Sequence, residues 1–200
     1  MAPRTPVALS LETIADAALA IGFRDLAITR VAEHLGVTHS AIYYYVPNRR
    51  GLIIAALDRA IAGIEAPDAT DDWRVLLTTE AELLRELMQA HRGVRAAIET
   101  VGDPVPAFRA RGHAMLGRLV ELGFAPWDAF VALDLIYNMV LAHGSDLPTE
   151  EADRPPDQLE ARFGADLGPM IGDALADPAM MFRRRIEVII AGIAATAGLG

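Results

Sequence analysis

A Gly-Val pair at residues 36–37, set between two short helical patterns, constrains this chain more than any other feature. Before the pair, Val31 and Leu35 are one helical turn apart. After it, Thr38 is placed to cap a second helix, which Pro47 must end because the residue before a proline avoids the helical conformation. Two helices joined by a short turn that usually needs glycine are typical of a helix-turn-helix, whose second helix lies in the major groove of DNA. The spacing therefore predicts a DNA-binding motif.

The second helix of this motif carries three consecutive tyrosines. Successive helical residues are about 100° apart, so one helix cannot bury all three. Ile42 and Val46 lie one turn apart and are expected to face a small core, and Ser40 and Tyr44 then face the opposite way, toward the groove. The other side chains placed to reach a base edge or a phosphate are Thr38, His39, Ala41, Tyr43 and Arg49.

The charge of the chain is unevenly distributed. A net charge of −9 argues against non-specific nucleic-acid binding by the whole chain, because phosphate contacts need a positive surface. Residues 1–64 hold six arginines and five acidic residues, a net charge of +1, whereas residues 65–200 hold twelve arginines and twenty-two acidic residues, a net charge of −10. We therefore expect only the N-terminal part to approach DNA.

Helical periodicity continues along the chain, without the alternating pattern of a strand. Ser10 is placed to cap a first helix and Asn48 a fourth, and the polar stretch at 67–72 marks a boundary. We expect an all-α protein with a head at residues 1–66 and a larger helical body at residues 67–200. Helices in the body are expected at about 72–91, 94–101, 105–122, 126–143 and 178–197, with an acidic loop at 145–178 that holds at most one or two short helices and is the most mobile segment.

Several kinds of site find no support in the residues. Cysteine is absent, which removes disulfides, thiolate metal sites and cysteine nucleophiles and fits a reducing compartment. The five histidines lack a metal-ligand spacing such as HExxH, and no serine sits in a GxSxG elbow. The first residues, MAPRTPVALSLE, lack the apolar run that a secretion signal would need, so we expect no export, and no apolar run is long enough to span a bilayer. We expect a cytoplasmic protein without enzyme activity, cofactor or metal.

The stretches TRVAEHLGV and GVTHSAIYYYVPNRRGLI resemble the signature of the TetR family of transcriptional regulators. Gly-Val, a Leu or Ile followed by Tyr, a Phe or Val, and a Lys or Arg after Asn or Ser recur there at this spacing. The similarity covers the first four helices. It implies that the residues facing DNA bases or backbone are His39, Ser40, Ala41, Tyr43 and Tyr44.

The same resemblance implies two further contacts and one departure. Arg49 takes the place of a phosphate-binding lysine, and Thr29 stands where a polar residue often touches the groove. A capping threonine or serine is usual at the start of the second helix, but this chain has Ala27 there. We expect Asp25 or Thr29 to cap that helix instead.

The body resembles the ligand-binding, dimerising domain of the branch that includes the Tet repressor. The similar segments are DWRVLLTTEAELLRELMQAHRGVRAAIE, LGFAPWDAFVALDLI and FRRRIEVIIAGIAA. The resemblance implies that two copies pair through their last two long helices as a four-helix bundle. In the last helix, small residues suit a close approach and isoleucines supply apolar area: Ala191, Gly192, Ala194 and Ala195, with Ile186, Ile189, Ile190 and Ile193.

A small-molecule effector is expected in an apolar pocket formed by the helices at about 72–91, 105–122 and 126–143. The residues expected near it are Met88, Phe108, Met115, Phe130, Asp134, Tyr137 and Asn138. Asp134 and Asn138 lie one turn apart on an apolar stripe, where polar groups must be hydrogen-bonded. A partner inside the protein or across a dimer interface is as reasonable for these two as a ligand.

These observations are interpreted as a homodimeric, DNA-binding transcriptional regulator, a repressor of a palindromic operator. Two recognition helices about one DNA turn apart would read the two half-sites, and an effector bound to the body would alter their separation. The alternative is a helical small-molecule binding protein or an enzyme whose head has no DNA function. Activation would use the same head as repression and stays open beside it.

Overall fold

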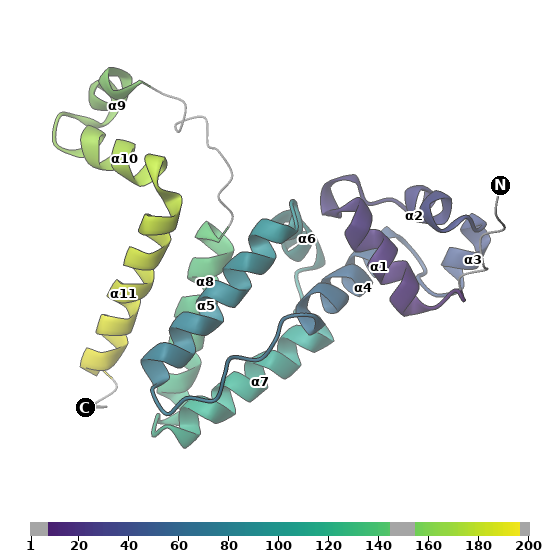
Figure 1. The fold of residues 1–200 in the computed structure, drawn as a ribbon, viewed down its shortest axis with the longest axis horizontal. Helices are drawn as coiled ribbons and strands as arrows, with labels where there is room; N and C mark the ends of the chain where they lie inside the picture. The colour runs from purple at the N-terminus through teal and green to yellow at the C-terminus, as the bar shows by residue number, and fades with distance from the viewer. Residues whose placement is uncertain (1–7, 145–154, 197–200) are drawn as a thin grey trace. The chain divides into compact units, whose positions relative to one another are not determined.

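The computed structural model describes residues 8–144 and 155–196, and every regular element in these two ranges is helical (Figure 1). The all-α class predicted from the periodicity is therefore confirmed. By their contacts the residues form two compact units. The first unit comprises Met1–Pro67 and Glu86–Gly117, and the second comprises Asp68–Arg85 and Arg118–Gly200. Residues 86–117 thus pack with the head, whereas the division predicted from the sequence assigned them to the body. The functional division into 1–66 and 67–200 stays a prediction.

The first unit begins with α1 (Leu11–Ile21), the short 3-10 turn η1 (Phe23–Asp25), α2 (Ile28–Leu35), α3 (His39–Tyr43) and α4 (Arg49–Ala62). Ser10 caps α1 as predicted. Its hydroxyl accepts a hydrogen bond from the Thr13 amide at 3.1 Å, and the Thr13 hydroxyl accepts one from the Ser10 amide at 2.9 Å. This reciprocal pair satisfies two of the amides that a helix start leaves open.

The head has an apolar core of its own, formed where α1 packs on α2 and α4. Its largest fully buried side chains are Ile14, Leu26, Val31, Ile42, Leu52 and Leu57. Each such side chain contributes about 1.5–3 kcal/mol by leaving water, so these helices hold their positions through one shared cluster.

The rest of the first unit comes from α6 (Val94–Val101) and parts of α5 (Trp73–Ala90) and α7 (Pro106–Glu121). α4 packs on α6. The Arg50 guanidinium donates to the Val101 carbonyl at 2.8 Å, and the Asp58 carboxylate accepts from the Ala107 amide at 2.7 Å. The bonds hold α4 to the end of α6 and the start of α7.

His91 lies between α5 and α6, half-buried, with its ring edge-on to Phe23 at a centroid distance of 6.2 Å. Burial removes water from the imidazole and lowers the pKa of His91. The neutral ring is therefore the form that packs here.

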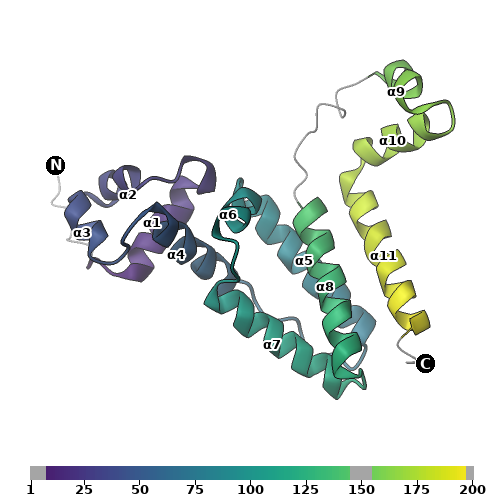
Figure 2. The same cartoon turned by 180° about the vertical axis from the view of Figure 1, so that it is seen from behind.

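The second unit contains α8 (Pro126–His143), α9 (Pro156–Phe163), α10 (Leu167–Ala176) and α11 (Pro178–Thr196). α11 packs against α8, and α9 against α10 (Figure 2). The expected acidic loop thus contains two short helices; its residues 145–154 lie outside the described ranges, and its mobility stays a prediction. Among the described helices, none is both long and apolar enough to cross a membrane.

The α9–α10 crossing depends on Gly168. A Cβ at this position would lie 2.6 Å from the Cα of Glu160 and 2.8 Å from its amide nitrogen, closer than real Cβ atoms approach backbone. Only glycine lets the two helices cross at this distance.

Replacing Gly168 with alanine should loosen the α9–α10 pair. The backbone of Glu160 cannot move aside cheaply, and overpacking of this kind costs about 1–3 kcal/mol. The expected result is faster hydrogen exchange in α9 and α10. Gly172→Ala on the same helix meets only the Leu159 Cδ1 atom, at 3.6 Å, and should leave exchange unchanged or slower. Equal exchange in the two variants would contradict the close crossing.

The stability of the chain should depend on pH through His91. Because folding lowers the pKa of this side chain, the unfolded chain takes up its proton first as the pH falls through about 6.5. The contribution of His91 is fully present above that pH and is lost below it. Urea unfolding should show a free energy of unfolding that falls on acidification, and a smaller fall in His91→Gln than in the control His113→Gln, which changes an exposed residue. The same fall in both variants would refute the assignment.

Candidate nucleic-acid interface

A tight turn joins α2 to α3. Gly36 ends α2 in the left-handed conformation, at a φ of 69°, where a side chain is strained. The Val37 amide then donates to the Ala32 carbonyl at 3.0 Å, which closes the end of α2. The turn therefore fixes the direction in which α3 leaves α2, as the Gly-Val pair predicts.

α3 is shorter than its sequence pattern predicts. The expected helix reached Pro47, but α3 ends at Tyr43, and Tyr44 and Tyr45 form a turn in which the amides of Tyr45 and Val46 both donate to the Ile42 carbonyl at 3.0 Å. The Thr38 hydroxyl caps the helix by accepting from the Ala41 amide at 3.3 Å. Ile42 and Val46 are 0% and 2% exposed and form its inner face, as predicted.

The face of α3 that points away from this core is exposed. Tyr44 is 85% exposed and Tyr43 is 52% exposed. The predicted DNA-contact residues that are exposed are Thr29, Thr38, His39, Ser40, Tyr43, Tyr44 and Arg49, whereas Ala41 is half-buried. The structure thus brings Thr38 to Tyr44 together on one short segment and places Thr29 on α2; their contacts with DNA stay a prediction.

Tyr45 has a structural task that the sequence did not reveal. Its hydroxyl donates to the Leu9 carbonyl at 2.7 Å, and its ring stands edge-on to that of Tyr44 at 5.1 Å. Tyr45 therefore ties the chain just before α1 to the end of α3. The only sequence signal for this contact was the run of three tyrosines, and that run does not indicate which of the three rings packs back against the protein.

Arg49 stands at the start of α4, which Asn48 caps as predicted by accepting from the Gly51 amide at 2.9 Å. The Arg49 Nε atom donates to the Leu26 carbonyl at 3.0 Å. This bond holds the exposed guanidinium near the chain that leads into α2. A cation held in this way beside a helix start is suited to a phosphate oxygen.

The start of α2 corrects an expectation. Ala27 is the N-cap residue, and no side chain caps the helix, so neither Asp25 nor Thr29 takes over that function. Asp25 instead lies 3.4 Å from the Arg30 guanidinium. Burial of Ile28 and Val31 stabilises the helix in place of a cap.

Two arginines of α4 form ion pairs with other parts of the first unit. The Arg59 guanidinium lies 2.7 Å from Asp16 and 3.7 Å from Glu12 on α1, and the hydrogen bond and charge of Asp16 raise the pKa of Arg59. Arg50, besides its bond to α6, lies 3.5 Å from Asp103. Ion pairs within the first unit therefore neutralise part of the positive charge that Arg50 and Arg59 bring to the head.

The predicted effector residues divide between the two units. Met88 and Met115 are buried and Phe108 is half-buried in the first unit; Phe130, Asp134, Tyr137 and Asn138 belong to the second. On α8 these four lie on one stripe, at positions i, i+4, i+7 and i+8, but they differ in exposure. Tyr137 is half-buried and donates to the Glu80 carboxylate at 3.2 Å, whereas Phe130, Asp134 and Asn138 are exposed. The Asn138 amide donates to the Asp134 carboxylate at 2.9 Å, so this polar pair is satisfied within α8.

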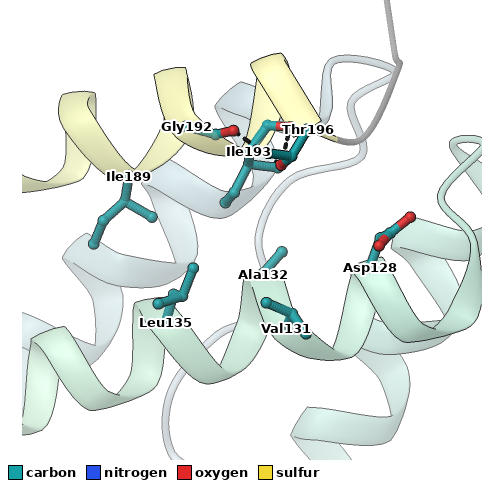
Figure 3. A pocket seen from close by; sticks show the side chains of 8 residues that line it. All are labelled: Asp128, Val131, Ala132, Leu135, Ile189, Gly192, Ile193 and Thr196. Carbon is teal, nitrogen blue, oxygen red and sulfur yellow. Dashed lines mark hydrogen bonds between the residues drawn. The ribbon is translucent and has the colours of Figure 1, made fainter.

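An apolar groove of about 370 Å³ lies between α8 and α11 (Figure 3). It is lined by Asp128, Val131, Ala132, Leu135, Ile189, Gly192, Ile193 and Thr196. Beside it, α8 exposes Trp127 and Phe130, whose rings are 5.5 Å apart, and α11 exposes Val188. These side chains leave a large apolar surface facing solvent.

The outer face of α11 differs in part from the expected one. Ala191, Gly192 and Ala195 are exposed, which suits a close approach by another helix. Ile186 and Ile193 are buried inside their own subunit instead, at 3% and 6% exposure. Periodicity predicts that α11 has apolar faces, but it does not indicate which apolar residues are buried in their own subunit and which are exposed.

The chain is similar over nearly its whole length to a known repressor. The class A tetracycline repressor protein from transposon 1721 of Escherichia coli is 28% identical over 201 residues, which cover 96% of this chain and 90% of the repressor. No family model matches the chain.

The fold is also similar to that of a solved regulator. Apo ActR from Streptomyces coelicolor superposes with a TM-score of 0.80 and 23% identity, over 98% of this chain and 99% of ActR. The structure of the same protein, described as a TetR family protein, in complex with actinorhodin superposes with a TM-score of 0.77 and 24% identity. The match covers 95% of this chain and 97% of ActR. The likeness in fold therefore extends across the described helices and is not confined to α1–α4.

Proposed function

We propose that the chain is a member of the TetR family of transcriptional regulators, and that it is a ligand-responsive repressor that binds a palindromic operator as a homodimer. Its similarity to a repressor over nearly the full length favours this function over a carrier or an enzyme with a silent head. The observation that carries the proposal is the exposed face of α3, opposite a fully buried Ile42.

The exposed face of α3 suits the major groove. Its side chains combine hydroxyl, imidazole and phenol groups, which donate to and accept from base edges and phosphates. Tyr44 is 85% exposed, and Arg49 supplies a cation at the start of the next helix, where a backbone carbonyl holds it. We propose that α3 reads bases while Thr38, Tyr43 and Arg49 bind phosphates on either side.

The apolar surface on α8 and α11 supports pairing of two copies. Trp127, Phe130 and Val188 are 72%, 51% and 58% exposed, which is costly for a monomer in water. A second copy that laid its own α8 and α11 on this surface would cover both the groove and these side chains. A two-fold arrangement of this kind presents two α3 helices to the two halves of a palindrome.

A small molecule is proposed to control DNA binding. ActR has been solved with actinorhodin, and the tetracycline repressor carries the name of a drug. For this chain we propose an effector bound by the body. It can release DNA only if it binds one spacing of the two heads more tightly than the other.

Tyr44→Ala and Arg49→Ala should each weaken binding to the DNA upstream of the chain's own gene. Fluorescence anisotropy should show a loss of about tenfold or more for each, and Arg49→Ala should also reduce the salt dependence by about one counterion. Arg95→Ala removes an exposed arginine of α6 that pairs with Glu99, and it should bind DNA like the wild type. Unchanged affinity in the first two variants would count against the interface.

Val188→Asp should separate the two copies. A carboxylate placed in an apolar contact loses water without a partner, at a cost of roughly 2 kcal/mol or more per copy. Analytical ultracentrifugation should show monomers for this variant and dimers for Val120→Asp, which puts the same charge at an exposed valine of α7. Dimers of equal stability in both variants would place the interface elsewhere.

A further inference from the structure

Tyr45 differs from the two tyrosines before it in what its hydroxyl contacts. Within the described residues this hydroxyl donates to the Leu9 carbonyl at 2.7 Å, whereas the Tyr43 and Tyr44 side chains are 52% and 85% exposed. A phenol has one O–H donor, and that of Tyr45 is used inside the protein. Because the oxygens of a DNA phosphate only accept hydrogen bonds, Tyr45 cannot donate to one while this bond lasts. Its place beside the candidate interface therefore calls for a different function.

The Leu9 carbonyl is a well-held acceptor for this bond. Leu9 immediately precedes Ser10, the cap of α1, and the two hydrogen bonds between Ser10 and Thr13, at 2.9 and 3.1 Å, hold the chain there. α1 in turn packs on α2 and α4, with Ile14 fully buried. A hydrogen bond to this carbonyl thus connects the end of α3 to the core of the head through α1.

α3 needs such a connection because it is short. It spans only His39–Tyr43 and packs chiefly on α2, and the buried side chains of its inner face are Ile42 and Val46. Both lie on the same side of the helix, so they hold α3 to the core but restrain its tilt toward or away from α1 only weakly. The bond from Tyr45 to Leu9 supplies that second restraint.

Tyr45 also supports the ring of Tyr44. The two rings stand edge to face, with centroids 5.1 Å apart and planes at 80°, which is a favourable arrangement for aromatic rings. At 85% exposure Tyr44 contacts little else of the protein, so the position of the Tyr45 ring restrains where the Tyr44 phenol points. A side chain held in place before DNA arrives loses less entropy on binding, and its hydrogen bonds need a defined direction.

We infer that Tyr45 is a positioning residue for base recognition: it fastens the end of α3 to the start of α1 and thereby orients Tyr44 toward the bases of the operator. The inference rests on the proposed function, in which α3 reads bases in the major groove. It gives the three consecutive tyrosines different functions, with Tyr43 at a phosphate, Tyr44 at the bases and Tyr45 holding Tyr44 in place. The DNA-contact residues predicted from the sequence did not include Tyr45.

Tyr45→Phe tests the inference because it removes the hydroxyl and keeps the ring. Fluorescence anisotropy with the full chain compares two duplexes of equal length: the DNA upstream of the chain's own gene and the same bases in scrambled order. We expect the affinity for upstream DNA to fall by roughly threefold to tenfold, the range for one lost hydrogen bond. The affinity for the scrambled duplex and the salt dependence of binding should stay unchanged, because the phosphate contacts are retained.

Tyr43→Phe is the matched control, because it removes the same hydroxyl from an exposed neighbour. As the loss of a phosphate ligand, it should weaken binding to both duplexes by a similar factor. A purely structural task for Tyr45 would lower the free energy of unfolding in urea and leave the preference for upstream DNA unchanged. That outcome in Tyr45→Phe would overturn the inference.

A double-mutant cycle shows whether Tyr45 acts through Tyr44. If it does, Tyr45→Phe should weaken binding by less than about twofold in a chain that already carries Tyr44→Ala. The full loss on that background would mean that Tyr45 contacts DNA itself, and it would overturn the inference. A wild type that does not prefer upstream DNA to the scrambled duplex would refute the proposed function, whereas a selective wild type and an equally selective Tyr45→Phe would refute this inference alone.

Discussion

Burial of Ile42 and Val46 is the constraint on which the candidate interface depends. α3 spans only His39–Tyr43, too short to be stable by its own hydrogen bonds. It persists because these two side chains join the core of the head and because Gly36 fixes the turn before it. Once that face is inside, geometry leaves Tyr44 outside. The exposed face is thus a consequence of the buried one.

In the head, the placement of individual arginines matters more than the net charge. Its net charge is small, and Arg59 and Arg50 are engaged with Asp16 and Asp103 within the first unit. Arg49, one residue before Arg50, is instead anchored by a backbone carbonyl, which carries no full charge. A neutral anchor holds the guanidinium in place without neutralising it, and this leaves its charge available to a phosphate.

In the second unit, apolar residues likewise differ in what they contact, according to their position on the helix. α8 and α11 each have one face that closes their own core and another that remains exposed, with Ile186 and Ile193 inside and Val188 outside on α11. Against this apolar background Glu80 is an exception, held by a hydroxyl from a residue 57 positions away.

Local signals in the chain determined the helical class, the helix bounds in the body to within a few residues, the caps at Ser10 and Asn48, and the buried pair on α3. Each depends on residues within one or two turns of one another. Tertiary packing alone decided that α2 starts without a side-chain cap, that Tyr45 turns back to Leu9, which isoleucines of α11 lie inside, and that Tyr137 meets Glu80. The reason is physical: a helical period tells that a residue is on a face, but only the neighbouring helix determines what that face touches.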